Sequence, residues 1–166
     1  YKELKDVANI EIRRGARLLS GGVTMNPARM QDVALRRAVV VGLNREALAK
    51  VRFQGLDYEE KLPNSMIHMP FNEYYQDDYP TPNNDAAAAA KILEEAGYTK
   101  NGEFYEKDGK QAAFKFSIVG EDPPSKAVGQ TLVQRLKSVG INAERDSRAV
   151  SEFNKTMASK DYDATS

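Results

Sequence analysis

Residues 31–48, QDVALRRAVVVGLNREAL, carry the clearest helical signal in the chain. Their apolar side chains recur every three or four residues, the spacing that places them on one face of an α-helix. These side chains are Val33, Leu35, Ala38, Val39 and Leu43. Asp32 precedes the run and is suited to cap its N-terminus. Asn44 interrupts the pattern, so Arg45–Val51 is predicted to be a second helix or a continuation of the first.

The rest of the chain alternates between predicted helices and predicted strands. Apolar spacing and terminal glycines predict helices at Ala86–Ala96, Pro123–Ser138 and Val150–Ala158. Polar–apolar alternation and short apolar runs predict strands at Asn9–Arg13, Leu18–Asn26, Ile141–Arg145 and Tyr162–Ala164. Asp108-Gly109, between Glu103–Glu106 and Gln111–Val119, predicts a β-hairpin. We therefore expect an α/β fold: a mixed sheet with flanking helices, in which the hairpin supplies the antiparallel pairing.

The composition excludes several classes of function. The chain has 166 residues, 24 Lys+Arg against 24 Asp+Glu, and no cysteine. Balanced charge without a basic stripe argues against a nucleic-acid partner. The absence of cysteine removes disulfides, thiolate nucleophiles and cysteine-based metal sites. No phosphate-binding glycine motif is present, and no apolar run approaches the roughly 20 residues that span a bilayer.

Reactive side chains are present without a catalytic pattern. His68 is the only histidine, and no nucleophile or second imidazole motif accompanies it, so a packing role is expected. A carboxylate-based hydrolase using Asp77, Asp78, Glu121 or Asp122 stays an alternative. It would need two of these carboxyl groups roughly 5–9 Å apart across a substrate. We expect no enzyme activity, no metal and no cofactor.

A long segment, Leu56–Pro82, shows no sustained periodicity and contains four prolines and four of the eight tyrosines. Irregular connections longer than roughly 12–15 residues are uncommon in compact domains and are often functional. The segment is therefore predicted to be a long irregular loop that lines a binding surface. A protein-interaction module that uses these tyrosines is a further alternative.

Four segments, in the correct order, resemble the family 5 extracellular solute-binding proteins, the oligopeptide, dipeptide and nickel-binding class of ABC importers. Residues 31–48 resemble the family's DVRVRRAIAYAIDREAL, and residues 85–98, DAAAAAKILEEAGY, resemble DPEKAKALLAEAGY. Residues 127–141 follow the pattern A..IQ..L.KIGI, and residues 153–164, FNKTMASKDYDA, follow F...L...DYDA. Together the four segments extend the resemblance over roughly residues 20–164.

The resemblance implies a non-catalytic receptor whose two lobes close around a ligand. Residues 1–166 would form a single, incomplete lobe. The implied partners are a peptide or small solute, the other lobe and the ABC permease subunits in the membrane, with no nucleic acid. The implied location is extracytoplasmic, in a periplasm or on a cell-surface lipoprotein.

Two segments fall where family members face the cleft: residues 120–123 and residues 64–70. The candidate ligand-binding residues are Gly120, Glu121, Asp122, Ser65, Met66 and His68. Some dipeptide binders place an arginine in the first segment to hold the ligand carboxylate, whereas this chain has Glu121 and Asp122. Charge complementarity then favours a cationic or neutral ligand. A solvated turn is the alternative for this segment.

Overall fold

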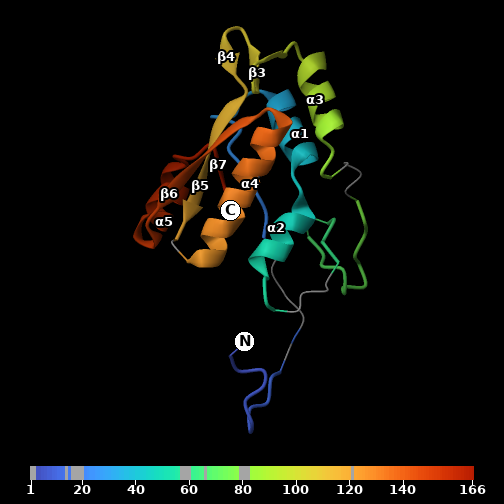
Figure 1. Ribbon diagram of the computed structural model, residues 1–166, viewed down its shortest axis with the longest axis vertical. Helices are drawn as coiled ribbons and strands as arrows, with labels where there is room; N and C mark the ends of the chain where they lie inside the picture. The colour runs from blue at the N-terminus through green and yellow to red at the C-terminus, as the bar shows by residue number, and fades with distance from the viewer. Residues whose placement is uncertain are drawn as a thin grey trace.

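The computed structural model describes residues 3–13, 15, 21–56, 61–65, 67–78, 83–120 and 122–166. Helices cover a central sheet, and a small second sheet stands at one end of the body (Figure 1). Within the described residues, no helix is long and apolar enough to cross a membrane.

The central sheet has the strand order β1-β7-β5-β6. These strands are β1 (Thr24–Met25), β7 (Ala164–Thr165), β5 (Ala113–Val119) and β6 (Asn142–Arg148). Strand β5 runs parallel to both of its neighbours and pairs with β6 over its whole length. Strand β1 pairs antiparallel with β7. The predicted α/β fold with a mixed sheet is confirmed.

The hairpin lies in the smaller sheet. That antiparallel sheet consists of β2 (Thr99–Asn101), β3 (Phe104–Lys107) and β4 (Lys110–Gln111). The prediction that Gln111–Val119 forms one hairpin strand is wrong, because the chain leaves the hairpin at Ala112. This residue is fully buried, and its carbonyl accepts a 2.8 Å hydrogen bond from the Asn142 N–H. The following strand, β5, pairs with β6 instead, so β1 supplies the antiparallel member of the central sheet.

The predicted helices are confirmed, and side chains cap most of their N-termini. They are α1 (Val33–Gly42), α2 (Arg45–Arg52), α3 (Ala86–Glu95), α4 (Pro123–Val139) and α5 (Phe153–Ser159), the last preceded by a 3-10 turn, Val150–Glu152. Asp32, Asn44 and Asp85 accept hydrogen bonds from backbone N–H groups in the first turns of α1, α2 and α3. These bonds satisfy donors that a helix N-terminus leaves unpaired.

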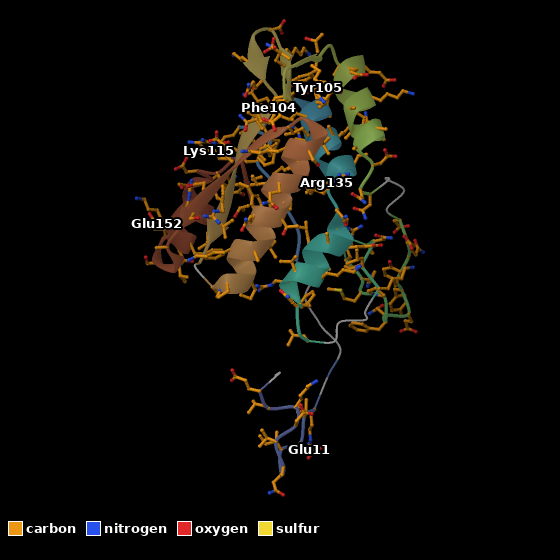
Figure 2. All side chains as sticks on the ribbon, in the orientation of Figure 1. Glu11, Phe104, Tyr105, Lys115, Arg135 and Glu152 are labelled. Atoms are coloured by element: carbon orange, nitrogen blue, oxygen red, sulfur yellow. The ribbon has the colours of Figure 1, made fainter. Side chains whose placement is uncertain are left out.

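Helices α1 to α4 pack together, and α4 joins them to the sheet. Helix α4 contacts β5 and β6, α2 lies beside α4, and α1 packs against α3 (Figure 1). Phe116, Leu132 and Ile141 are fully buried between the sheet and α4. Arg135, which lies on α4, donates hydrogen bonds to the carbonyls of Gly42 at 2.9 Å and Asn84 at 3.2 Å (Figure 2). The arginine thereby joins α4 to the end of α1.

Several predicted strands are shorter or absent. Residues 9–13 form no strand and stay exposed, so that prediction is wrong. Alternation alone does not make a strand, because a strand requires an edge to pair with. Only Thr24–Met25 is a strand in the predicted range 18–26, of which residues 18–20 lie outside the described residues. The described residues of 56–82 contain no helix or strand, as predicted.

The segment after β1 is tied to the segment before β7. The backbone N–H of Asn26 donates to the Asp163 carbonyl at 2.8 Å, and its side-chain amide donates to the Lys160 carbonyl at 2.9 Å. Arg29 forms salt bridges to Asp161 at 2.9 Å and Asp163 at 2.8 Å. Four contacts therefore fix the pairing of β1 with β7 across more than 130 residues of chain.

Candidate functional site

The three parallel strands of the central sheet end at the same edge. Val119, Arg148 and Thr165 are the last residues of β5, β6 and β7. In open α/β sheets, ligands bind outside the carboxyl ends of the strands. Gly120 follows β5 directly, with a left-handed backbone (φ 105°), and its N–H donates to the Arg148 carbonyl at 3.0 Å. The first predicted segment therefore begins at this edge.

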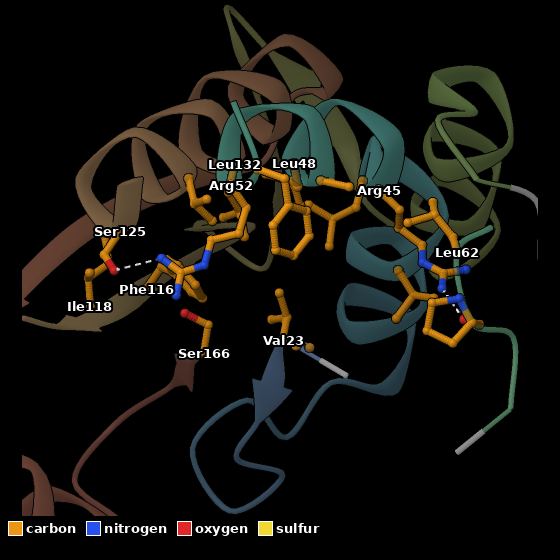
Figure 3. A pocket seen from close by; sticks show the side chains of 18 of the residues that line it. Val23, Arg45, Leu48, Arg52, Leu62, Phe116, Ile118, Ser125, Leu132 and Ser166 are labelled. Atoms are coloured by element: carbon orange, nitrogen blue, oxygen red, sulfur yellow. Dashed lines mark hydrogen bonds between the residues drawn. The ribbon is translucent and has the colours of Figure 1, made fainter. Parts of the chain in front are cut away.

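A large cavity lies beside the same edge. Its volume is about 880 Å³, within the range of roughly 300–1,000 Å³ typical of ligand pockets. Its walls come from α2, α4, β5, residues 21–25, residues 61–63 and residues 69–71. Figure 3 shows side chains from these separate elements converging on one space. The cavity is the candidate ligand-binding site.

The lining of the cavity is mostly apolar. Val23, Leu48, Phe116, Ile118 and Leu132 surround its centre in Figure 3. Phe116 and Leu132 are fully buried, and Ile118 is almost so. The remaining apolar lining residues are Met25, Val40, Leu43, Ala49, Phe53, Leu62, Pro63, Met69, Pro70, Phe71, Val119 and Val128. Such a lining favours ligands that bring apolar surface out of water.

Arg52 and Ser125 stand at one end of the cavity (Figure 3). Nη1 of Arg52 lies 3.5 Å from Oγ of Ser125 and 3.7 Å from Oδ1 of Asp122. Asp122 caps α4, because its Oδ1 also accepts the backbone N–H of Ser125 at 3.0 Å. Its side-chain hydrogen bond with Ser125 is the largest of the effects that hold the pKa of Asp122 below its ordinary value. The carboxylate of Asp122 is therefore ionised. It caps α4 and lies near the guanidinium of Arg52.

Arg45 stands at the other end of the cavity (Figure 3). Its guanidinium donates to Oδ1 of Asn64 at 2.8 Å and to the carbonyl of Pro63. These bonds attach the start of the predicted loop to α2. Since Arg45 and Arg52 are seven residues apart, two turns of helix place them on the same face of α2.

The second predicted segment borders the cavity. Oγ of Ser65 accepts the backbone N–H groups of Ile67 at 3.3 Å and His68 at 3.2 Å. The His68 ring lies 5.9 Å from the Tyr74 ring, centroid to centroid. The next two residues, Met69 and Pro70, line the cavity, whereas Ser65 and His68 do not. The structure therefore places this segment at the wall of the cavity.

Four of the six candidate residues can be placed. None of these four is in the lining. Gly120 and His68 directly adjoin lining residues, Asp122 accepts the N–H of the lining residue Ser125, and Ser65 lies two residues beyond the lining residue Pro63. Glu121 and Met66 lie outside the described residues. Sequence reasoning missed the contribution of α2. The spacing of Arg45, Leu48 and Arg52 is a usable signal, since it places two cations and a leucine on one helix face.

Two of the four carboxylates proposed for hydrolysis, Asp77 and Asp122, have local partners. Oδ2 of Asp77 binds Nζ of Lys61 at 3.0 Å, and its Oδ1 accepts the side-chain amide of Asn64 at 2.7 Å. These hydrogen bonds, that of Lys61 first, lower the pKa of Asp77. Both contacts hold the irregular loop together. Within the described ranges, no three His, Asp or Glu side chains gather as a metal site would require.

The family described as "Bacterial extracellular solute-binding proteins, family 5 Middle" matches residues 1–166. The oligopeptide-binding protein OppA of Mycobacterium tuberculosis is 25% identical over 124 residues, which is 75% of this chain and 21% of OppA. The chain thus spans about a fifth of the length of this relative.

Two solved structures share the fold. An ABC transporter substrate-binding protein from Sinorhizobium meliloti is 28% identical, with a TM-score of 0.66 over 86% of this chain and 28% of that one. The oligopeptide-binding protein AppA of Bacillus subtilis, in complex with a nonapeptide, is 22% identical, with a TM-score of 0.69. That alignment covers 86% of this chain and 29% of AppA.

Proposed function

Because this chain belongs to the family 5 extracellular solute-binding proteins of bacteria, we propose that it forms a ligand-binding lobe of an ABC-importer receptor. The lobe captures peptides or a related small solute for import. The observation that carries this proposal is the apolar cavity of about 880 Å³ beside the carboxyl ends of the parallel strands. Oligopeptide binding by OppA and AppA supports peptides as the first class to test.

The proposed receptor acts outside the cytoplasmic membrane, free in a periplasm or anchored as a lipoprotein. Its partners are the ABC permease subunits and a second lobe. In this proposal the chain forms part of one lobe of the receptor. It spans about a fifth to under a third of the length of its relatives. The lobe holds its side of the ligand, and closure against the second lobe completes the site.

Gly120, Glu121, Asp122, Ser65, Met66 and His68 are proposed to border the bound ligand. Gly120 brings the backbone to the edge of the sheet, and Asp122 fixes the start of α4. Ser65 holds the backbone of the second segment through two N–H groups. Their contribution would be to shape the mouth of the cavity.

The direct test is mass spectrometry of solute that co-purifies with the receptor as the cell makes it. We expect a peptide or small solute in stoichiometric amount, together with loss of its uptake in cells that lack the receptor. A receptor that retains no solute and whose loss leaves uptake of peptides and other solutes unchanged would refute the function.

A second test addresses the site. Gly120→Val is expected to weaken binding of the co-purified solute by at least about tenfold (1.4 kcal/mol), since a side chain at φ 105° strains the sheet edge. Glu103→Gln, at an exposed position beside β3, is the control and should bind normally. Unchanged affinity in the glycine variant would place the ligand elsewhere.

A further inference from the structure

The charged side chains in the described lining of the cavity are all positive. Among the described residues that line it, Arg45, Arg52 and Lys61 are cationic and none is acidic. Lys61 is paired with Asp77, which lies outside the lining, and Arg45 holds Asn64 and Pro63. These two cations therefore have structural tasks in attaching residues 61–65. Arg52 is the third cation of this lining.

Arg52 is held only weakly by its described neighbours. Its distance of 3.7 Å to Asp122 exceeds the 2.7–2.9 Å of a good hydrogen bond between charged groups. Its distance of 3.5 Å to Ser125 exceeds the 2.7–3.2 Å that is usual for an N–H···O bond. Both contacts use Nη1, although a guanidinium carries five N–H donors. The Arg52 side chain is 47% exposed and lines the cavity. Its guanidinium can therefore accept an anionic partner there without losing a strong contact.

The rest of the lining favours a ligand that is apolar outside its anionic group. Outside the three cations, the polar side chains of the described lining are those of Ser125 and Ser166. Few side chains of this wall could pair with the N–H and C=O groups of a peptide main chain, and each buried group left unpaired costs about 1–3 kcal/mol. Hydrocarbon or aromatic groups carry no such cost.

We propose that the cavity binds an apolar group that carries one carboxylate, and that Arg52 pairs with the carboxylate. The inference rests on the proposed function and specifies the class of ligand. The group is either the C-terminal residue of a peptide with a large apolar side chain or a free apolar carboxylic acid. This differs from the preference for a cationic or neutral ligand, which rests on Glu121 and Asp122, since Asp122 caps α4 and lies outside the lining.

Calorimetry on the receptor as the cell makes it, freed of bound solute, distinguishes the two sources of carboxylate. One arm compares acetyl-phenylalanyl-leucine with its C-terminal amide, and the other compares octanoate with octanamide. The acid should bind at least about tenfold more tightly than its amide in one arm (1.4 kcal/mol). The arm that shows this difference identifies the source of the carboxylate.

Two arginine variants locate the effect. Arg52→Gln should bring the acid-to-amide ratio close to one, whereas Arg37→Gln, on the exposed face of α1, should keep the wild-type ratio. Ala49→Phe should weaken acid and amide equally, because it fills the cavity without changing its charge. A melting curve for each variant verifies folding. If Ala49→Phe fails to fold, the arginine pair still decides.

Failure of this inference differs from failure of the function. Equal binding of acid and amide in both arms, or an unchanged ratio in Arg52→Gln, overturns the inference. So does absence of binding by all four probes to a receptor that co-purifies with a solute, which would mean that other parts of the receptor fill the cavity. A receptor without co-purified solute or transport activity overturns the function itself.

Discussion

The hydroxyl of Tyr98 donates a 2.8 Å hydrogen bond to Oδ2 of Asp32, the residue that caps α1. The other carboxylate oxygen of Asp32 accepts the N–H groups of Ala34 and Leu35. Burial alone would raise the pKa of Asp32, but the hydrogen bonds from Tyr98 and from these N–H groups outweigh it and lower the pKa. One carboxylate thus joins the start of α1 to the end of α3.

Tyr98→Phe removes this link while keeping the ring. We expect the free energy of unfolding to fall by about 1.5–3 kcal/mol, the cost of losing a hydrogen bond to a charged group. Urea denaturation measures the change. Tyr74→Phe is the matched control, because the Tyr74 ring is 67% exposed. Equal stability of the two variants would contradict a structural role for the Tyr98 hydroxyl.

The same pair predicts a loss of stability in alkali. Burial, and then the hydrogen bond to Asp32, raise the pKa of Tyr98 to about 12. Because the tyrosine of the unfolded chain ionises near pH 10, the folded state binds more protons between about pH 10 and 12. Stability therefore falls as the pH rises through this window. Thermal melts from pH 9 to 11.5 should show a shallower decline in Tyr98→Phe than in wild type; parallel curves would contradict the assignment.

Among the contacts that join the segments next to β1 and β7, the side-chain hydrogen bonds of Asn26 are predicted to contribute most to the free energy of unfolding. Its side chain, only 7% exposed, accepts the Ala28 N–H and donates to the Lys160 carbonyl. Asn26→Ala leaves both groups unpaired, and we expect a loss of about 2–4 kcal/mol at about 1–2 kcal/mol each. Asn101→Ala, at an exposed position in β2, should change stability by less than about 0.5 kcal/mol. A loss below 1 kcal/mol for Asn26→Ala would show that water replaces these bonds.

At Gly129, α4 packs closely against Ile118 of the sheet. A Cβ atom at this position would lie 1.9 Å from Cδ1 of Ile118. Gly129→Ala should therefore destabilise by about 1–3 kcal/mol, although alanine is the better helix former by about 1 kcal/mol. Ile118→Val in the same chain removes the clashing methyl group and should recover part of the loss. A double-mutant cycle with no coupling energy would contradict this contact.

Local signals predicted much of the fold. Asp32, Asn44 and Asp85 each lie directly before a helix that they cap, so capping and apolar spacing located the helices. Four short segments also identified the family correctly. The hairpin strand was overextended because alternation in residues 111–119 is the same whether the chain pairs with β3 or with β6. The choice is made at Ala112 by a contact with Asn142, 30 residues away in sequence.

The cavity could not be predicted either, because it too depends on contacts between segments that lie far apart in the sequence. Its lining brings together Val23, Leu48 and Ile118, from segments that share no sequence pattern. The predicted residues Gly120 and Ser65 came close because they lie in loops next to lining residues. Arg52 was missed because a cation near the end of a helix is usually solvated. Its place in the cavity lining depends on the packing of α2 beside α4 and β5, which the local sequence does not reveal.

The antiparallel pairing of β1 with β7 brings residues 24–25 and residues 164–165 side by side, although about 140 residues separate them in sequence. Asn26 and Arg29 bind the segment that precedes β7, and β7 in turn pairs with β5. A displacement of β1 would therefore be transmitted through β7 to the centre of the sheet. The two short strands behave mechanically as one edge, although each is only two residues long.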